Sequence, residues 1–111
     1  MSVNRVLLVG RLGATPELRY TPKGKAVCRL SVATDAYSKE KGKITDWHRV
    51  VVWERQAEVC SRYLTKGGMV AVEGRLHTDS WEGEDGKKRY ATEVVAGHVS
   101  FLGSRPKEGE R

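Results

Sequence analysis

The amino-acid sequence predicts a single all-β domain that carries one short helix. With 111 residues, of which 39% are hydrophobic, the chain is long enough for one domain with its own core and too short for two of typical size. Most apolar residues alternate with polar ones, as they do in strands with one buried face. Only one segment has apolar residues at the spacing of a helix, and turn-forming residues separate the segments.

The first two predicted strands lie at the N-terminus. Residues 5–12 form the first strand, and residues 17–21 continue it after a break that contains turn-forming residues. The stretch TPKGK, residues 21–25, predicts a turn, because proline can set one corner and glycine can accept a positive φ. Residues 26–34 then form the second strand and place Arg29 on the face opposite the larger apolar side chains.

A polar loop precedes the third predicted strand, and a helix follows it. Residues 35–45 are polar, carry three lysines and predict a mobile hairpin loop. The third strand occupies residues 46–55. Apolar residues then recur every three or four positions, which predicts a helix over residues 55–66 that stops at Gly67 and Gly68.

Two further strands complete the predicted domain. Residues 69–81 and 88–102 are both rich in strand-forming residues, and the Asp-Gly pair between them is typical of a hairpin connection. We therefore expect residues 1–102 to form one domain. Residues 103–111 are polar and contain a proline, and we expect them to be a disordered tail.

The order of these elements predicts a five-stranded Greek-key OB barrel with one short helix between strands three and four. In this fold, strands two and three and the loops beside them form the face that binds oligonucleotides. An SH3-like barrel or a Greek-key sandwich would also accommodate the strands. The position of the single helix favours the OB barrel.

One face of the third strand has an unusual composition. A core rarely accepts two arginines without partners, and an exposed face rarely carries two indoles without something to cover them. The face therefore predicts a ligand. Core packing or a subunit interface is the alternative for the tryptophans, and their alternation with arginine disfavours it. In the sequence DWHRVVVWER the pleat places on this face Trp47, Arg49, Val51, Trp53 and Arg55.

The composition of the chain limits its partners and its compartment. The net charge of +6 favours an acidic partner, and nucleic acid is favoured over a membrane because no amphipathic basic helix and no long apolar run is present. The N-terminus lacks the features of a signal peptide, so we expect a cytoplasmic protein. Cys28 and Cys60 lie far apart in the sequence, which predicts reduced, buried thiols.

No segment predicts catalysis or a bound cofactor. The histidines and cysteines lack the spacing of a metal site, so we expect neither a metal nor another cofactor. The sequence shows no phosphate-binding loop, nucleophile elbow or convincing pair of carboxylates, and we expect no enzymatic activity. His48 points to the aliphatic side of its strand, where we expect it to pack or to contact a second subunit.

Five segments also carry a family resemblance. They are LVGRLGATPELRYTPKGKAV, TDWHRVVVWERQAE, YLTKGG, VEGRL and RYATEVVA. Their order and spacing resemble the DNA-binding domain of bacterial single-stranded DNA-binding proteins, from about Val3 to Leu102. The resemblance implies an OB fold that assembles as a homotetramer, with single-stranded DNA bound on the outside. For stacking on bases it implies Trp47, Trp53 and Trp81, and for contacts to the DNA backbone Arg5, Arg49, Arg55 and Lys66.

The sequence also departs from this family. Many members have a further tryptophan near the end of the second strand, where this chain has Ser38, and Tyr37 beside it is the candidate to stack in its place. Asp79 and Ser80 stand where relatives often have basic residues. Members typically continue into an acidic tip that recruits replication and repair proteins, and we expect no such acidic tail in this chain.

The function expected from these observations is sequence-independent binding and protection of single-stranded DNA during replication, recombination and repair. Aromatic faces accept any base, while cations follow the phosphates. One alternative is a protein-interaction OB module, in which the same aromatic residues contact a protein. A nuclease is another, which the missing catalytic residues disfavour. RNA binding is a closer variant, and the preference for DNA rests on the resemblance.

Overall fold

The structure is a computed structural model that describes residues 1–103 as six strands and one helix. Of the predicted tail, Gly103 is the last residue of the final strand, and residues 104–111 lie outside the described residues. The elements are β1 (Val6–Leu12), β2 (Leu18–Tyr20), β3 (Ala26–Ser38), β4 (Gly42–Trp53), α1 (Glu54–Tyr63), β5 (Met69–Glu82) and β6 (Lys88–Gly103).

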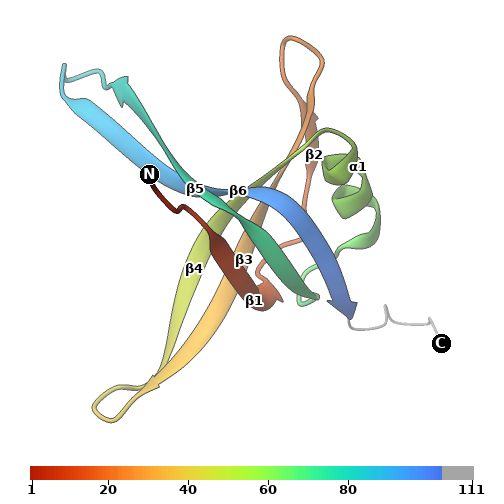
Figure 1. Cartoon of the computed structure of the whole chain (residues 1–111), viewed down its shortest axis with the longest axis vertical. Helices are drawn as coiled ribbons and strands as arrows, with labels where there is room; N and C mark the ends of the chain where they lie inside the picture. Colours follow the sequence, from red (N-terminus) through yellow and green to blue (C-terminus); the bar gives the residue numbers. More distant parts are fainter. Residues whose placement is uncertain (104–111) are drawn as a thin grey trace.

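The strands form one sheet that closes into a barrel. Their order is β1-β5-β6-β4-β3-β2, and β1 also pairs with β3 at Arg11↔Ala33 and Leu12↔Val32, which closes the sheet (Figure 1). β1 and β2 are the two halves of the first predicted strand, so five strand positions form the barrel. α1 lies between the third and fourth of them. The prediction of a five-stranded OB barrel with one helix is confirmed.

Valines from several strands fill the barrel, and α1 covers one end of it. Ala57, Cys60 and Leu64 are fully buried against this core, as the helical spacing of these residues predicts. Among residues 1–103, no helix is long and apolar enough to cross a bilayer. The buried side chains of the core belong to Leu12, Ala26, Cys28, Leu30, Val32, Val50, Val52, Ala57, Cys60, Leu64, Val70, Val72, Val94 and Val99.

The helix ends earlier than its glycines predict. α1 stops at Tyr63, because Leu64 adopts an extended backbone while its side chain enters the core. Gly67 does not cap the helix. It has a φ of 87° in the turn that leads into β5, where its amide donates to the carbonyl of Leu12 over 2.8 Å.

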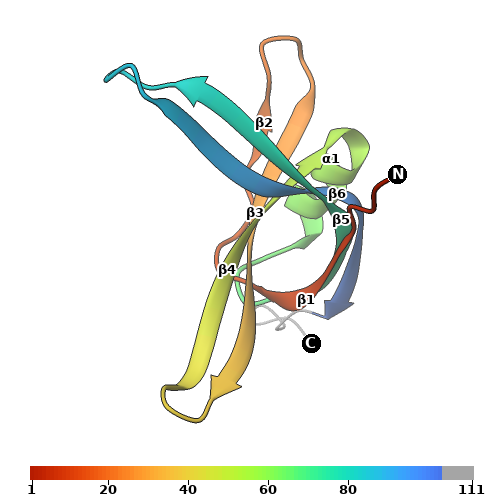
Figure 2. The same cartoon turned by 60° about the vertical axis from the view of Figure 1, so that its left-hand side comes forward.

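Two long hairpins project from the barrel (Figures 1 and 2). The first, which we call the β3–β4 arm, comprises residues 35–45, and the second, the β5–β6 arm, comprises residues 77–92. The prediction of a mobile loop over residues 35–45 is wrong, because β3 and β4 stay paired as far as Ser38↔Gly42. The hydroxyl of Thr45 donates to the carboxylate of Asp35 over 2.7 Å, which ties the two strands of this arm together.

Candidate nucleic-acid interface

The outward side of β4 carries the two tryptophans and the arginine that the alternation predicts. Trp47 is 59% exposed, Trp53 is 37% exposed, and Arg49 between them is also exposed. Exposed indoles of this size are unusual on a solvent-facing sheet. Neither ring is a core residue, so the alternative reading of these tryptophans as core packing is excluded.

The register extends this surface from β4 to β3 and β2. Trp53 pairs with Val27 on β3, and Val27 pairs with Arg19 on β2. Residues that oppose each other in a sheet point to the same side, so Arg19 lies on the same side as Trp53. Arg29 of β3 lies one row further along this side. We call the surface formed by Arg19, Arg29, Trp47, Arg49 and Trp53 the Trp-Arg face.

Val51 belongs to this side of β4 but is buried. Its register neighbours are Arg29 on β3 and Val95 on β6, and only 1% of its surface is exposed. An aliphatic side chain between Arg49 and Trp53 supports its neighbours instead of meeting a ligand. The ligand-facing positions of β4 are therefore Trp47, Arg49 and Trp53.

The ring of Trp47 lies against Gly13. A Cβ atom placed on Gly13 would come within 2.4 Å of Cζ3 and 2.8 Å of Cη2 of the indole, which is closer than atoms can approach. The absence of a side chain at Gly13 thus makes room for the ring. One part of the indole rests on the backbone between β1 and β2, while most of the side chain stays exposed.

Trp81 and Tyr37 lie on the two arms. Trp81 is half exposed on the β5–β6 arm and pairs across the hairpin with Arg89. Tyr37 is exposed near the end of the β3–β4 arm and pairs with Lys43. Each arm therefore places an aromatic ring opposite a basic residue, which repeats the composition of the Trp-Arg face.

The other three predicted site residues lie on different elements. Arg55 was expected on the same face as Trp53, but the chain turns at Glu54, whose φ is 61°, and Arg55 enters α1. Left-handed backbone at a glutamate is uncommon and marks this sharp turn. The expectation that Arg55 continues the strand pattern is wrong.

Arg5 and Lys66 are exposed outside the strands. Arg5 precedes β1 and forms an ion pair with Glu73 of β5. Lys66 lies between α1 and β5, and its backbone amide donates to the hydroxyl of Thr15 over 3.1 Å. The predicted residues thus form one continuous group on β4, with two aromatic residues on the arms and three separate basic residues.

A groove of about 450 Å³ separates β4 from the β5–β6 arm. Trp47 and Arg49 line one side, and Leu76 and Tyr90 line the other. Sequence reasoning did not identify Leu76 or Tyr90, because both belong to the inward-pointing set of their strands, and only the divergence of the arm from the barrel exposes them. His48 also lines the groove, and its Nε2 lies 2.8 Å from the hydroxyl oxygen of Thr34.

The ionisable core groups are two thiols. Burial raises the pKa of Cys28, and burial together with the nearby Cys28 raises the pKa of Cys60 to about 12. Both thiols therefore stay protonated at neutral pH, and neither is paired in a disulfide. Within residues 1–103, no group of three His, Cys, Asp or Glu side chains gathers closely enough to hold a metal ion.

Comparison with known proteins agrees with this arrangement. Residues 3–102 match the Single-strand binding protein family. A single-stranded DNA-binding protein of Neisseria meningitidis serogroup A is 43% identical over 109 residues, which cover 95% of this chain and 63% of that protein. Its counterpart in Bacillus cereus is 46% identical over 111 residues, which cover 98% of this chain and 65% of that protein.

A solved structure has the same fold. The Plasmodium falciparum SSB, determined as a complex with ssDNA, superimposes with a TM-score of 0.80 and is 32% identical, covering 92% of this chain and 96% of that one. The chain spans somewhat less than two thirds of the length of the two bacterial relatives. The family match covers nearly all of residues 1–103, and the chain belongs to the Single-strand binding protein family.

Proposed function

We propose that this protein binds single-stranded DNA without sequence preference. The observation that carries the proposal is the alternation of exposed Trp47, Arg49 and Trp53 on one strand of an OB barrel. The names of the bacterial relatives and the ssDNA in the Plasmodium complex support the same ligand. Trp81, Tyr37, Arg5, Arg55 and Lys66 are further proposed contacts outside this group.

In the proposed mechanism, aromatic rings contact the bases and cations contact the phosphates. Each indole stacks on a base, and every base has a flat face, so stacking does not depend on sequence. Arg49 lies between the two indoles, where it can contact the phosphates that connect the stacked nucleotides. Duplex DNA keeps its base faces stacked inside the helix, and the indoles can therefore contribute little to duplex binding.

The proposed biological role follows from this binding. A protein that covers single strands keeps them unpaired and protects them during replication, recombination and repair. We propose residues 1–102 as the binding domain, acting without catalysis or a cofactor. Single-stranded DNA arises at the bacterial nucleoid, and we propose the cytoplasm as the compartment.

We also propose that the chain acts as a homo-oligomer, with the tetramer as the favoured form. β1 pairs with β5 along one edge, whereas its other edge meets β3 only at Arg11 and Leu12. Leu7 and Val9 are largely exposed on this strand. An apolar strand with an unpaired edge favours association with a second copy.

The first experiment is a titration of the intrinsic tryptophan fluorescence with oligo-dT, duplex DNA and an RNA homopolymer. Oligo-dT should quench the fluorescence strongly and duplex DNA only weakly, since stacking requires accessible base faces. Trp53→Ala should weaken oligo-dT binding by about 1 to 3 kcal/mol. Arg49→Ala should mainly reduce the dependence of affinity on salt, by about 0.7 in the log-log slope for one phosphate contact.

The matched control is Tyr63→Ala, which removes an exposed aromatic side chain from α1 and should leave binding unchanged. Equal binding of all three nucleic acids with little quenching would contradict the stacking mechanism. It would favour a protein-binding role for the same rings.

A further inference from the structure

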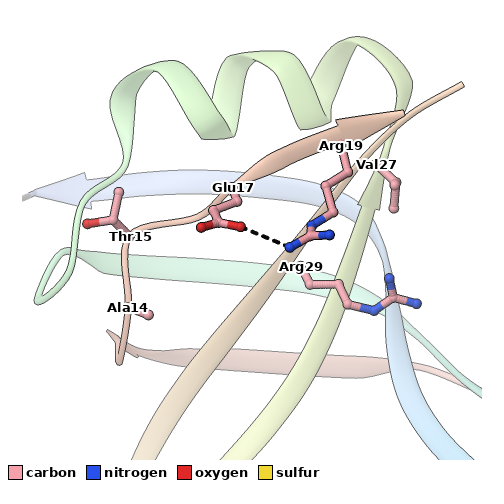
Figure 3. A pocket seen from close by; sticks show the side chains of 6 residues that line it. All are labelled: Ala14, Thr15, Glu17, Arg19, Val27 and Arg29. Carbon is pink, nitrogen blue, oxygen red and sulfur yellow. Dashed lines mark hydrogen bonds and ion pairs between the residues drawn. The ribbon is translucent and has the colours of Figure 1, made fainter. Parts of the chain in front are cut away.

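A hollow of about 510 Å³ lies at the edge of the Trp-Arg face, where Arg19 and Arg29 line it (Figure 3). Three consecutive parts of the chain form it: the segment between β1 and β2, β2 itself, and the start of β3. Figure 3 shows Arg19 of β2 turned towards Glu17, while Arg29 of the neighbouring strand β3 extends in the direction of β6. The lining residues are Ala14, Thr15, Glu17, Arg19, Val27 and Arg29.

Each arginine in the hollow contacts a carboxylate with one nitrogen. An Nη atom of Arg19 lies 3.1 Å from a carboxylate oxygen of Glu17, and both side chains are mostly exposed. Nε of Arg29 lies 3.7 Å from Glu93 of β6, whose side chain is only 16% exposed. A guanidinium has five N–H donors, so most of the donors of both arginines are not used by these carboxylates.

The position of the hollow relative to the Trp-Arg face is fixed by the register. Arg19, Val27 and Trp53 occupy one row across β2, β3 and β4. Neighbouring strands lie about 4.8 Å apart, so the backbone of Arg19 is roughly 10 Å from that of Trp53. Val27 is buried between them and leaves an apolar floor. A strand whose base covers Trp53 therefore passes within reach of both arginines.

We propose that this hollow binds a backbone phosphate of the single strand whose neighbouring base stacks on Trp53. The inference rests on the proposed function and assigns Arg19 and Arg29 as its phosphate ligands. Both arginines keep unused N–H donors, so a phosphate that enters the hollow can accept charge-assisted hydrogen bonds from either guanidinium. Binding here extends the path of the strand across β4, β3 and β2.

Glu17 has a second role in this arrangement. Its carboxylate occupies Arg19 in the unbound protein, and an incoming phosphate must replace it. Glu17 therefore lowers the affinity of the hollow for any anion, and its removal should strengthen binding. Glu93 is less suited to such an exchange, because it is mostly buried and remains beside Arg29.

The test measures oligo-dT affinity over a range of salt concentrations for Arg19→Ala, Arg29→Ala and the double variant. Loss of the phosphate contact should reduce the log-log salt slope by about 0.7. The maximal quenching of tryptophan fluorescence should stay unchanged, because no ring is removed. Glu17→Gln should strengthen binding by about 1.5- to 5-fold, the range expected for release of an exposed ion pair.

Arg62→Ala is the matched control, since it removes an exposed arginine from the last turn of α1. If the parent protein binds oligo-dT but Arg19→Ala, Arg29→Ala and the double variant all keep the salt slope of Arg62→Ala, the phosphate site is refuted and the proposed function stands. If the parent itself fails to bind, the proposed function is refuted and the inference fails with it. Weaker binding by Glu17→Gln would refute the exchange between Glu17 and phosphate.

Discussion

At the scale of single residues, the contact between Gly13 and Trp47 controls the position of a ring that we propose to stack on DNA. The indole is exposed, so few packing contacts hold it, and the backbone of Gly13 is the surface on which it rests. A residue that has no contact with the ligand can thus determine how the ring is presented. The free energy of DNA binding that depends on this ring position is that of one stacking contact, about 1 to 3 kcal/mol.

We expect Gly13→Ala to displace the Trp47 ring, because the new Cβ would lie 2.4 Å from the indole. Oligo-dT binding should weaken by up to about 2 kcal/mol, measured by fluorescence titration. The effect should disappear when Trp47→Ala is already present, since no ring is then left to displace.

Gly97→Ala provides the control for this substitution. A Cβ at Gly97 would meet only ordinary van der Waals contact, 3.5 Å from the carbonyl oxygen of Glu73. Equal losses for Gly13→Ala in the presence and absence of Trp47 would show that the glycine acts through the backbone and not through the ring.

At the scale of elements, α1 places the thiol of Cys60 in the core, and we expect this to lower the stability of the fold in alkaline solution. The pKa of Cys60 is about 12 in the folded protein, against an ordinary value of 9.0. Between these two pH values the unfolded chain has lost the proton and the folded chain retains it. Because the unfolded state then binds fewer protons, the free energy of unfolding falls as the pH rises above about 9.

Over the pH range in which only the unfolded chain has lost the Cys60 proton, the free energy of unfolding should fall by about 1.4 kcal/mol per pH unit. Urea unfolding between about pH 8 and pH 10 measures it. The Cys60→Ala variant should show a shallower decline, whatever its stability at neutral pH, because only the slope reports the thiol. Parallel slopes for the parent and the variant would contradict the assignment.

The elements differ in how far the sequence determines them. Alternation in residues 46–53 predicted the exposed tryptophans, and the spacing of Ala57, Cys60 and Leu64 predicted the buried side of α1. Both predictions succeeded because the position of apolar residues in a strand or helix depends on which side packs against the core. The length of the β3–β4 arm was not predictable in this way. Neither of its faces is buried, so its strands carry no apolar pattern.

Strand pairing and turn geometry account for one site residue that the sequence did not reveal and for one that it placed on the wrong face. Arg19 joins Trp53 only through the pairing of β2 with β3 and of β3 with β4. Arg55 left the predicted face because the chain turns at Glu54, and a glutamate gives no local signal of positive φ. Pairing and turn geometry, and not composition, determine both cases.

At the scale of the whole molecule, the free edge of β1 predicts how copies of the chain associate. We expect the parent protein to have a native mass four times the 12.4 kDa of one chain. Replacing both Leu7 and Val9 by lysine should yield the single-chain mass, because charged side chains on an exposed strand oppose association. Light scattering after size-exclusion chromatography measures the mass.

The control Tyr63→Lys introduces a lysine at an exposed aromatic position of α1 and should leave the mass unchanged. A parent that already elutes with the mass of one chain would contradict the proposed assembly. Retention of the oligomer in the Leu7 and Val9 variant would assign the contact to another surface.

The distribution of buried residues also separates the molecule into two parts that differ in their resistance to local unfolding. The core side chains lie in the barrel and α1, whereas residues 35–45 and 77–92 include none that is buried. Opening either arm exposes little apolar surface, and the arms can therefore unpair without cost to the core. The barrel should therefore resist local unfolding more than either arm does.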